Sequence, residues 1–159
     1  MESIEPTRYE TGRPMLLGGL RQSHPFSESG SSIAEQWRQF QSIDRIPGRL
    51  GTNVYGVMCG SNAGGFEYMC AVEVENLADL PDSLGRMRIQ AQEYGVFEHR
   101  GDRSTIPTTW ESIFEWLTNS GIYQSAHRPD FEVYDDTIDS ATGSGRVEIW
   151  VSISRKPES

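Results

Sequence analysis

The chain repeats one order of expected elements: a strand, a helix and then two further strands. Alternating polar and apolar residues predict strands, and apolar residues three or four apart predict helices. In the first half these patterns lie at 13–22, 32–40, 53–59 and 66–74. In the second half they lie at 86–101, 104–121, 130–136 and 146–154. This order favours an α+β fold made of two strand-helix-strand-strand units.

A chain of 159 residues can bury the core of one domain without metals or disulfides. We therefore expect a single domain over 1–159, made of two similar halves at about 5–80 and about 86–155. The formal net charge is -9, from 23 Asp and Glu against 14 Lys and Arg. Such an acidic balance repels phosphate backbones, so we expect no direct binding to nucleic acid.

Several classes of protein have no signal in the sequence. No apolar N-terminal run resembles a signal peptide or a membrane span, and Cys59 and Cys70 lack a metal-ligand spacing. We expect a reduced, cytoplasmic protein that makes no contact with a membrane. Catalytic triads, phosphate-binding loops, dinucleotide fingerprints and zinc spacings are likewise missing from the sequence, so we expect neither a metal nor a cofactor.

The helix boundaries have local signals. Ser32 followed by Glu35 has the spacing of a capping box, so the first helix is expected to begin at Ser32. His24 then falls in the preceding loop, where no partner is evident. In the second helix Pro107 suits the first turn and Gly121 suits the C-terminal cap. Its apolar face is expected to comprise Ile106, Trp110, Ile113, Phe114 and Leu117.

The last expected strand carries an unusual pair of side chains. Its alternation places four apolar residues on the core face: Val147, Ile149, Val151 and Ile153. Glu148 then shares the opposite face with Trp150. This pair is typical either of a solvated strand surface or of a pocket floor for a hydrophobic cation. In the second case, an unpaired carboxylate sheltered from water would have a raised pKa until a cation arrived.

The chain resembles a known family in the order and spacing of its motifs. "EYGVFEHRGDRSTIPTTWESIFEWLTNSGI", "RPDFEVYDD" and "VEIWVSI" are similar to the effector-binding domain of gyrase-inhibitor-like proteins. The same domain is the C-terminal domain of AraC-type and MerR-type multidrug-responsive activators. A close branch of the family comprises the integron cassette proteins of the Cass2 kind. In the first half "PMLLGGLR" and "FEYMCAVEVENLADLP" extend the likeness to about residues 5–155.

This resemblance implies a duplicated fold with pseudo-twofold symmetry, antiparallel sheets, helices on one side and a ligand groove on the other. It also implies that Glu148 meets flat hydrophobic cations among aromatic residues in that groove. Two features depart from the family. Its activators carry a helix-turn-helix region ahead of this domain, whereas about a dozen residues precede the first expected strand here, so we expect no DNA binding in cis. Ser152 stands where the family often has a proline.

The remaining candidate residues are aromatic. Overlaying the two halves matches Tyr68 with Glu148, so the Tyr68 hydroxyl is expected in the same groove. Phe97, in the strand before the second helix, and Trp37, on the first helix, are further candidates. Structural interpretations stand beside these: a helix-face tryptophan such as Trp37 is more typical of a core, and Trp150 suits cross-strand packing.

Three functions are consistent with this pattern. The first is a stand-alone protein that senses or sequesters hydrophobic, often cationic, small molecules, with Glu148 as charge anchor among Tyr68, Trp150, Phe97 and Trp37. The second, implied by the resemblance, is hydrolysis of strained, cyclopropane-bearing toxins, in which Glu148 activates a water and Tyr68 donates a hydrogen bond. The third is an adaptor that docks on a protein such as gyrase or on a separate regulatory partner.

Overall fold

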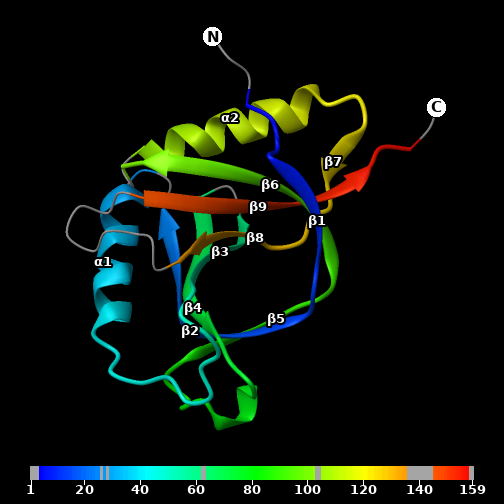
Figure 1. The fold of residues 1–159 in the computed structure, drawn as a ribbon. Helices are drawn as coiled ribbons and strands as arrows, with labels where there is room; N and C mark the ends of the chain where they lie inside the picture. The colour runs from blue at the N-terminus through cyan, green and yellow to red at the C-terminus, as the bar shows by residue number, and fades with distance from the viewer. Residues whose placement is uncertain are drawn as a thin grey trace. The chain divides into compact units, whose positions relative to one another are not determined.

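The computed structural model of the chain describes residues 4–25, 27, 29–61, 64–102, 105–135 and 145–157. The chain forms two compact units. The central unit comprises Pro14–Gln90, and the terminal unit comprises Met1–Arg13 together with Ala91–Ser159. Each combines an antiparallel sheet with one α-helix, so the predicted α+β class is confirmed (Figure 1). Among the described residues, no helix is long and apolar enough to cross a membrane.

The central unit contains a four-stranded sheet in the order β3-β4-β2-β5, with helix α1 against β2 and β4 (Figure 1). Its elements are β2 (Met15–Pro25), α1 (Ser29–Gln41), β3 (Val54–Ser61), β4 (Gly65–Glu73), the 3-10 helix η2 (Leu77–Asp79) and β5 (Gly85–Ile89). The expected hairpin is present, because β3 and β4 pair in antiparallel fashion. Apolar side chains of α1, β4 and the following loops form the core, which includes Phe40, Ile46, Tyr68, Cys70, Val72, Val74, Leu80 and Leu84.

A buried polar cluster joins α1 to its sheet, and it differs from expectation. The helix begins at Ser29, so Ser32 lies inside it and does not cap it. The Ser32 hydroxyl instead lies 2.7 Å from Nδ1 of His24, which is a buried residue of β2 and not part of a loop. Gln36 contacts Nε2 of His24 and donates through Nε2 to main-chain carbonyls of β2 and β4, both at 2.9 Å. These bonds satisfy polar groups that would be costly to bury alone.

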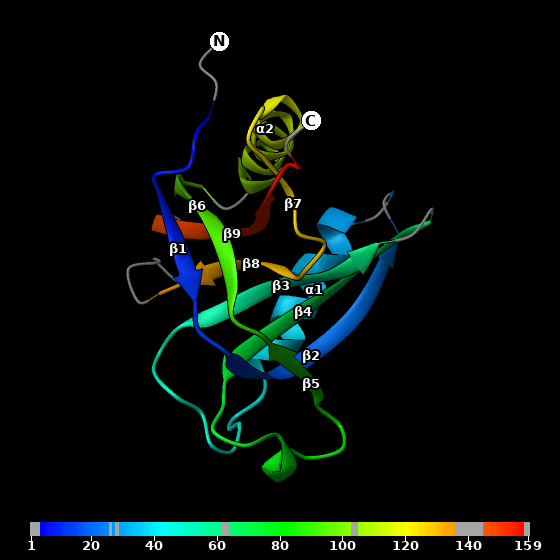
Figure 2. The same ribbon diagram turned by 90° about the vertical axis from the view of Figure 1, so that its right-hand side faces the viewer.

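The terminal unit contains a sheet in the order β1-β6-β9-β8, and β7 also pairs with β9. Its elements are β1 (Arg8–Gly12), β6 (Gln92–Gly101), α2 (Ile106–Asn119), β7 (Tyr123–Ser125), β8 (Asp130–Tyr134) and β9 (Gly145–Arg155). The sequence patterns did not predict β1, which lies antiparallel to β6 (Figure 2). The expected first half, at about 5–80, therefore includes a strand that pairs within the terminal unit.

One face of the terminal sheet packs under α2. The predicted core positions Val147, Ile149, Val151 and Ile153 are all buried. Phe97 lies opposite Ile149 in the β6-β9 register, and its ring contacts that of Trp116 on α2 at 5.4 Å between centroids. On α2, Ile106, Trp110 and Ile113 are buried as expected, but Phe114 is exposed, so the predicted apolar face was one residue too wide.

Candidate functional site

The second face of the terminal sheet, turned away from α2, carries Glu148. Directly opposed residues on antiparallel strands point to the same side of a sheet. The pairs Trp150 with Val96, Trp150 with Phe131, and Tyr94 with Ser152 therefore share the face of Glu148. On the neighbouring strand β1, Arg8 lies opposite Val96 and Glu10 opposite Tyr94. We call the group on this side the Glu148 face: Arg8, Glu10, Tyr94, Phe131, Glu148 and Trp150.

Three aromatic rings form a platform on the Glu148 face. Trp150 stacks on Phe131 with 5.5 Å between centroids and 17° between planes. Tyr94 meets both edge-on, 5.4 Å from Trp150 and 5.3 Å from Phe131. Tyr94 and Phe131 are buried, whereas Trp150 is partly exposed, so it is the ring a ligand can reach. Sequence reasoning missed Tyr94 and Phe131, since the pairing of β6 and β8 with β9 was needed to assign them to this face.

Arg8 binds Glu148 directly. Its Nη1 donates to Oε2 of Glu148 at 2.7 Å, and its Nε donates to Oε1 of Glu10 at 2.8 Å. The guanidinium carbon lies 5.6 Å from the centroid of the Trp150 ring, within the range of a cation-π contact. Trp150 in turn donates through Nε1 to Oε1 of Glu148 at 3.2 Å.

These contacts reverse the expected electrostatics of Glu148. Its side chain is only 16% exposed. The hydrogen bond from Arg8 nevertheless holds the pKa of the Glu148 carboxyl below its usual value against the opposing effect of burial, and Trp150 adds to this. The same bond raises the pKa of Arg8. The prediction of an unpaired carboxylate with a raised pKa was therefore wrong, because β1 and its arginine were not foreseen.

The structure brings Glu148 and Trp150 together, but it does not add the other predicted residues to them. Phe97 is 0% exposed on the opposite, helix-covered face. Tyr68 and Trp37 belong to the central unit, where Tyr68 is 2% exposed and its ring lies 6.2 Å from that of Trp37. Ligand contacts by these three residues stay a prediction; for Phe97 and Tyr68 such contacts would require a core to open, whereas Trp37 is partly exposed.

The expected overlay of the two halves was wrong by one residue. Tyr68 lies on the sheet face under α1, whereas Glu148 lies on the face away from α2. Matching the helix-covered faces of the two sheets aligns Tyr68 with Ile149 and Glu67 with Glu148. Glu67 also pairs with an arginine, Arg21 of the neighbouring strand. The counterpart of Glu148 in the central unit is therefore a second arginine-paired glutamate.

Beside the aromatic platform lies a partly buried acid, Asp130. Oδ1 of Asp130 accepts the main-chain N–H of Ser152 at 2.8 Å and its hydroxyl at 3.0 Å. Burial outweighs these bonds and raises the pKa of Asp130 to about 6. Burial, together with the charge of Asp130, raises the pKa of Tyr94 to about 12. A proline at position 152 would have no N–H to donate, so the serine found here supports a bond that the common family residue could not make.

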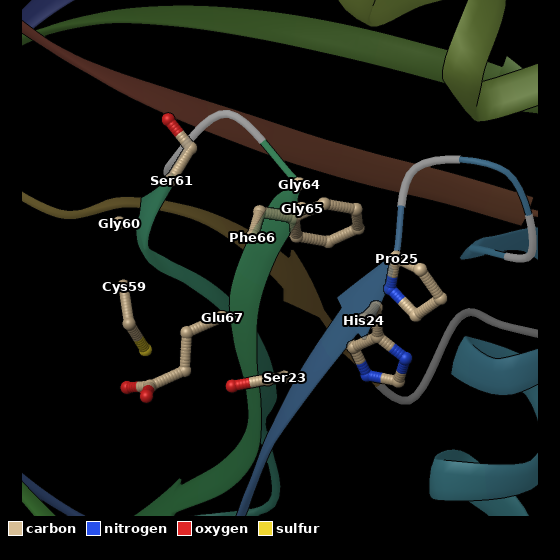
Figure 3. A pocket seen from close by; sticks show the side chains of 10 residues that line it. All are labelled: Ser23, His24, Pro25, Cys59, Gly60, Ser61, Gly64, Gly65, Phe66 and Glu67. Atoms are coloured by element: carbon tan, nitrogen blue, oxygen red, sulfur yellow. The ribbon is translucent and has the colours of Figure 1, made fainter.

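A hollow of about 440 Å³ lies at the hairpin end of the central unit. It is lined by Ser23, His24, Pro25, Cys59, Gly60, Ser61, Gly64, Gly65, Phe66 and Glu67. The side chains of Ser23, Cys59 and Glu67 gather on one side of β4, and those of His24 and Phe66 lie on the other (Figure 3). Burial raises the pKa of the Cys59 thiol to about 11, so it is protonated and weakly nucleophilic at neutral pH.

The charges of this hollow are compensated, because Arg21 pairs with Glu67. Within the described ranges, no three His, Cys, Asp or Glu side chains are grouped to hold a metal ion. The lining residues that the structure describes thus offer hydroxyl and thiol groups and one phenyl ring, that of the partly exposed Phe66. The Glu148 face combines charge and aromatic area, and it is the stronger candidate site.

Comparison with known proteins gives consistent results. A family model described as the GyrI-like small molecule binding domain matches residues 6–154. The transcriptional regulator BrlR of Pseudomonas aeruginosa is 29% identical over 111 residues, which cover 69% of this chain and 41% of BrlR. The chain thus spans less than half of that regulator.

Two solved structures have the same fold. SAV2435, in a structure with bound tetraphenylphosphonium, has a TM-score of 0.75 at 20% identity and covers 97% of this chain and 94% of its own. The integron cassette protein VCH_CASS2 from Vibrio cholerae has a TM-score of 0.67 at 16% identity and covers 96% and 98% respectively. The family match extends over nearly the whole sequence and agrees with the resemblance in its motifs. The chain therefore belongs to the GyrI-like small molecule binding domain family.

Proposed function

We propose that the chain binds hydrophobic cations on the Glu148 face. The observation that carries this proposal is that the site already holds a cation. The guanidinium of Arg8 makes a charge-assisted hydrogen bond to Glu148 and lies near the ring of Trp150. A site that accommodates one organic cation has the charge and the aromatic surface to accommodate another.

The chemistry of the face favours lipophilic cations over other solutes. A carboxylate repels anions, and a cation-π contact adds roughly 0.5 to 2 kcal/mol per well-placed ring. The partly exposed ring of Trp150, which stacks on Phe131, can cover part of the apolar body of a ligand. Small hydrated ions gain little from such a surface. SAV2435, which has the same fold, has been solved with the lipophilic cation tetraphenylphosphonium, and this supports the proposal.

Binding would serve sequestration or sensing. A sequestering protein only lowers the free concentration of its ligand. A sensor must pass the bound state to a partner, and BrlR, a relative of this chain, is a transcriptional regulator. A separate regulatory partner for this chain is therefore part of the proposal. The predicted absence of direct nucleic-acid contact stays a prediction.

Hydrolysis has less support from the geometry. A general base works best when its pKa lies near the working pH, whereas the Arg8 bond lowers the pKa of Glu148. Tyr68, the hydrogen-bond donor in that hypothesis, is buried in the core of the central unit. The adaptor hypothesis gains no specific support from the described surface.

The test is a calorimetric titration with rhodamine 6G and with tetraphenylphosphonium. Glu148→Gln keeps the shape of the side chain and removes its charge, so we expect the dissociation constant to rise about tenfold or more. Glu67→Gln is the matched control, since it removes an arginine-paired glutamate at the equivalent position of the central unit; its affinity should stay within about twofold of wild type. Failure of the wild-type protein to bind either cation, or equal effects of the two substitutions, would reject the proposal.

A further inference from the structure

We infer that Arg8 is a built-in competitor for the ligand: its guanidinium occupies the position on Glu148 and Trp150 that the cationic group of a ligand takes. The preferred ligands are then planar cations with N–H donors, namely amidines and guanidines attached to an apolar body. This inference rests on the proposed function and adds both the chemical class of the ligand and a means of setting its affinity.

The contacts of Arg8 define the shape of the cation that fits. Two carboxylates accept from different nitrogens of one planar group, at 2.7 Å for Glu148 and 2.8 Å for Glu10. The aromatic ring of Trp150 lies alongside. Fork-like donors on a flat, delocalised cation match this arrangement, whereas a compact ammonium provides neither the fork nor the stacking surface.

The charges of the site favour exchange. Glu10 and Glu148 carry two negative charges against the single positive charge of Arg8, which bonds to both. The more distant charge of Arg146 also acts on Glu148, but Arg146 is paired with Asp135. When the arginine side chain turns away, both acids face the arriving cation. Glu148 is then paired with Arg8 in the free protein and with the cation in the complex, so the sheltered carboxylate is never left unpaired. This is the condition under which such a charge can be retained at little cost.

Displacement of Arg8 requires only a side-chain movement. Its side chain is 40% exposed, and it extends from the first residue of β1, a strand that pairs only with β6 in the described part of the chain. A partly exposed ion pair is weak, because water can replace much of what is lost. The flexible stem of the arginine can therefore swing towards solvent while β1 remains paired.

The experiment compares binding in wild-type protein, Arg8→Ala and Arg38→Ala. Arg38 is the control, because it is an arginine of the central unit that forms an exposed pair with Glu35 on α1. Because Arg8→Ala lacks the competitor, its dissociation constant for tetraphenylphosphonium should be about tenfold lower than that of wild type. The dissociation constant of Arg38→Ala should stay within about twofold of wild type. In wild type, 2-naphthamidine should bind more tightly than 2-naphthylmethylammonium, which has the same charge but no planar fork of donors; equal affinities would reject the preference for amidines and guanidines.

A second measurement does not depend on the variant. The Nε–H signal of Arg8, followed by nuclear magnetic resonance in the wild-type protein, should shift and exchange faster with water when either cation saturates the site. The inference fails if cations bind in a Glu148-dependent way while this signal stays unchanged, or if Arg8→Ala binds no more tightly than wild type. If neither wild type nor Arg8→Ala binds any cation, the proposed function fails as well. Binding by Arg8→Ala but not by wild type would reject cation binding as the function of the wild-type protein, while supporting the competitor role of Arg8.

Discussion

Replacing Asp130 by asparagine is expected to stabilise the protein at neutral pH and to have little effect in acid. The partly buried carboxyl lies near Tyr94 and accepts two hydrogen bonds from Ser152. Burial raises its pKa from the usual 3.8 to about 6. A rise of this size corresponds to about 3 kcal/mol of unfavourable free energy when the folded protein carries the ionised form.

The direction of the pH dependence follows from where the proton is held. Below pH 3.8 the carboxyl is protonated in both the folded and the unfolded chain, and its full contribution to stability is present. Between that value and about pH 6 the unfolded chain ionises first, so stability falls as the pH rises. Asparagine keeps an oxygen acceptor for Ser152 and never ionises. The free energy of unfolding of Asp130→Asn should therefore exceed that of wild type by an amount that grows from near zero at low pH to as much as about 3 kcal/mol at neutral pH.

Urea unfolding of wild type and Asp130→Asn, followed by circular dichroism across the acid-to-neutral range, measures this difference. Asp82→Asn, in an exposed turn, is the control and should give a small difference with no trend in pH. An advantage of Asp130→Asn that is the same at every pH, or a loss of stability at neutral pH, would refute the reasoning.

Two further predictions concern packing. Phe97→Ala should lower the free energy of unfolding by about 3 to 5 kcal/mol, because it empties a fully buried site under α2; a loss below about 1 kcal/mol in urea unfolding would contradict that assignment. Gly19→Ala should yield no stably folded protein, because the added Cβ would lie 1.9 Å from the carbonyl oxygen of Cys70. Gly121→Ala is the control: its added Cβ would have open space, so this variant should fold like wild type. A wild-type thermal midpoint for Gly19→Ala would show that β2 and β4 are not so closely paired.

The elements that the sequence predicted are those with a local signal. The helix pattern around Trp110, the glycine-rich hairpin turn and the alternation through Ile149 each depend on residues close together in the chain. They therefore indicated α2, the β3-β4 pair and the buried face of β9. Local periodicity could not set the width of the apolar face, which is why Phe114 was assigned to the core although it is exposed.

The partners of Glu148 could not be predicted in the same way. Arg8 lies 140 residues from Glu148 in the sequence, and no pattern near either residue links them. The overlay of the two halves was wrong for another reason. Strand side chains alternate, so a shift of one residue moves a side chain to the other face of the sheet. That shift matched buried Tyr68 with a residue on the sheet face turned away from α2.

The pairing of β1 with β6 has a consequence for the order in which the protein is made. A ribosome releases the whole central unit, Pro14–Gln90, before it releases the strand that β1 requires. During synthesis β1 therefore remains without β6 while the residues that follow it in the sequence can already fold. Only when translation has passed β9 can Arg8 reach Glu148, so this ion pair forms only after the whole central unit has been synthesised.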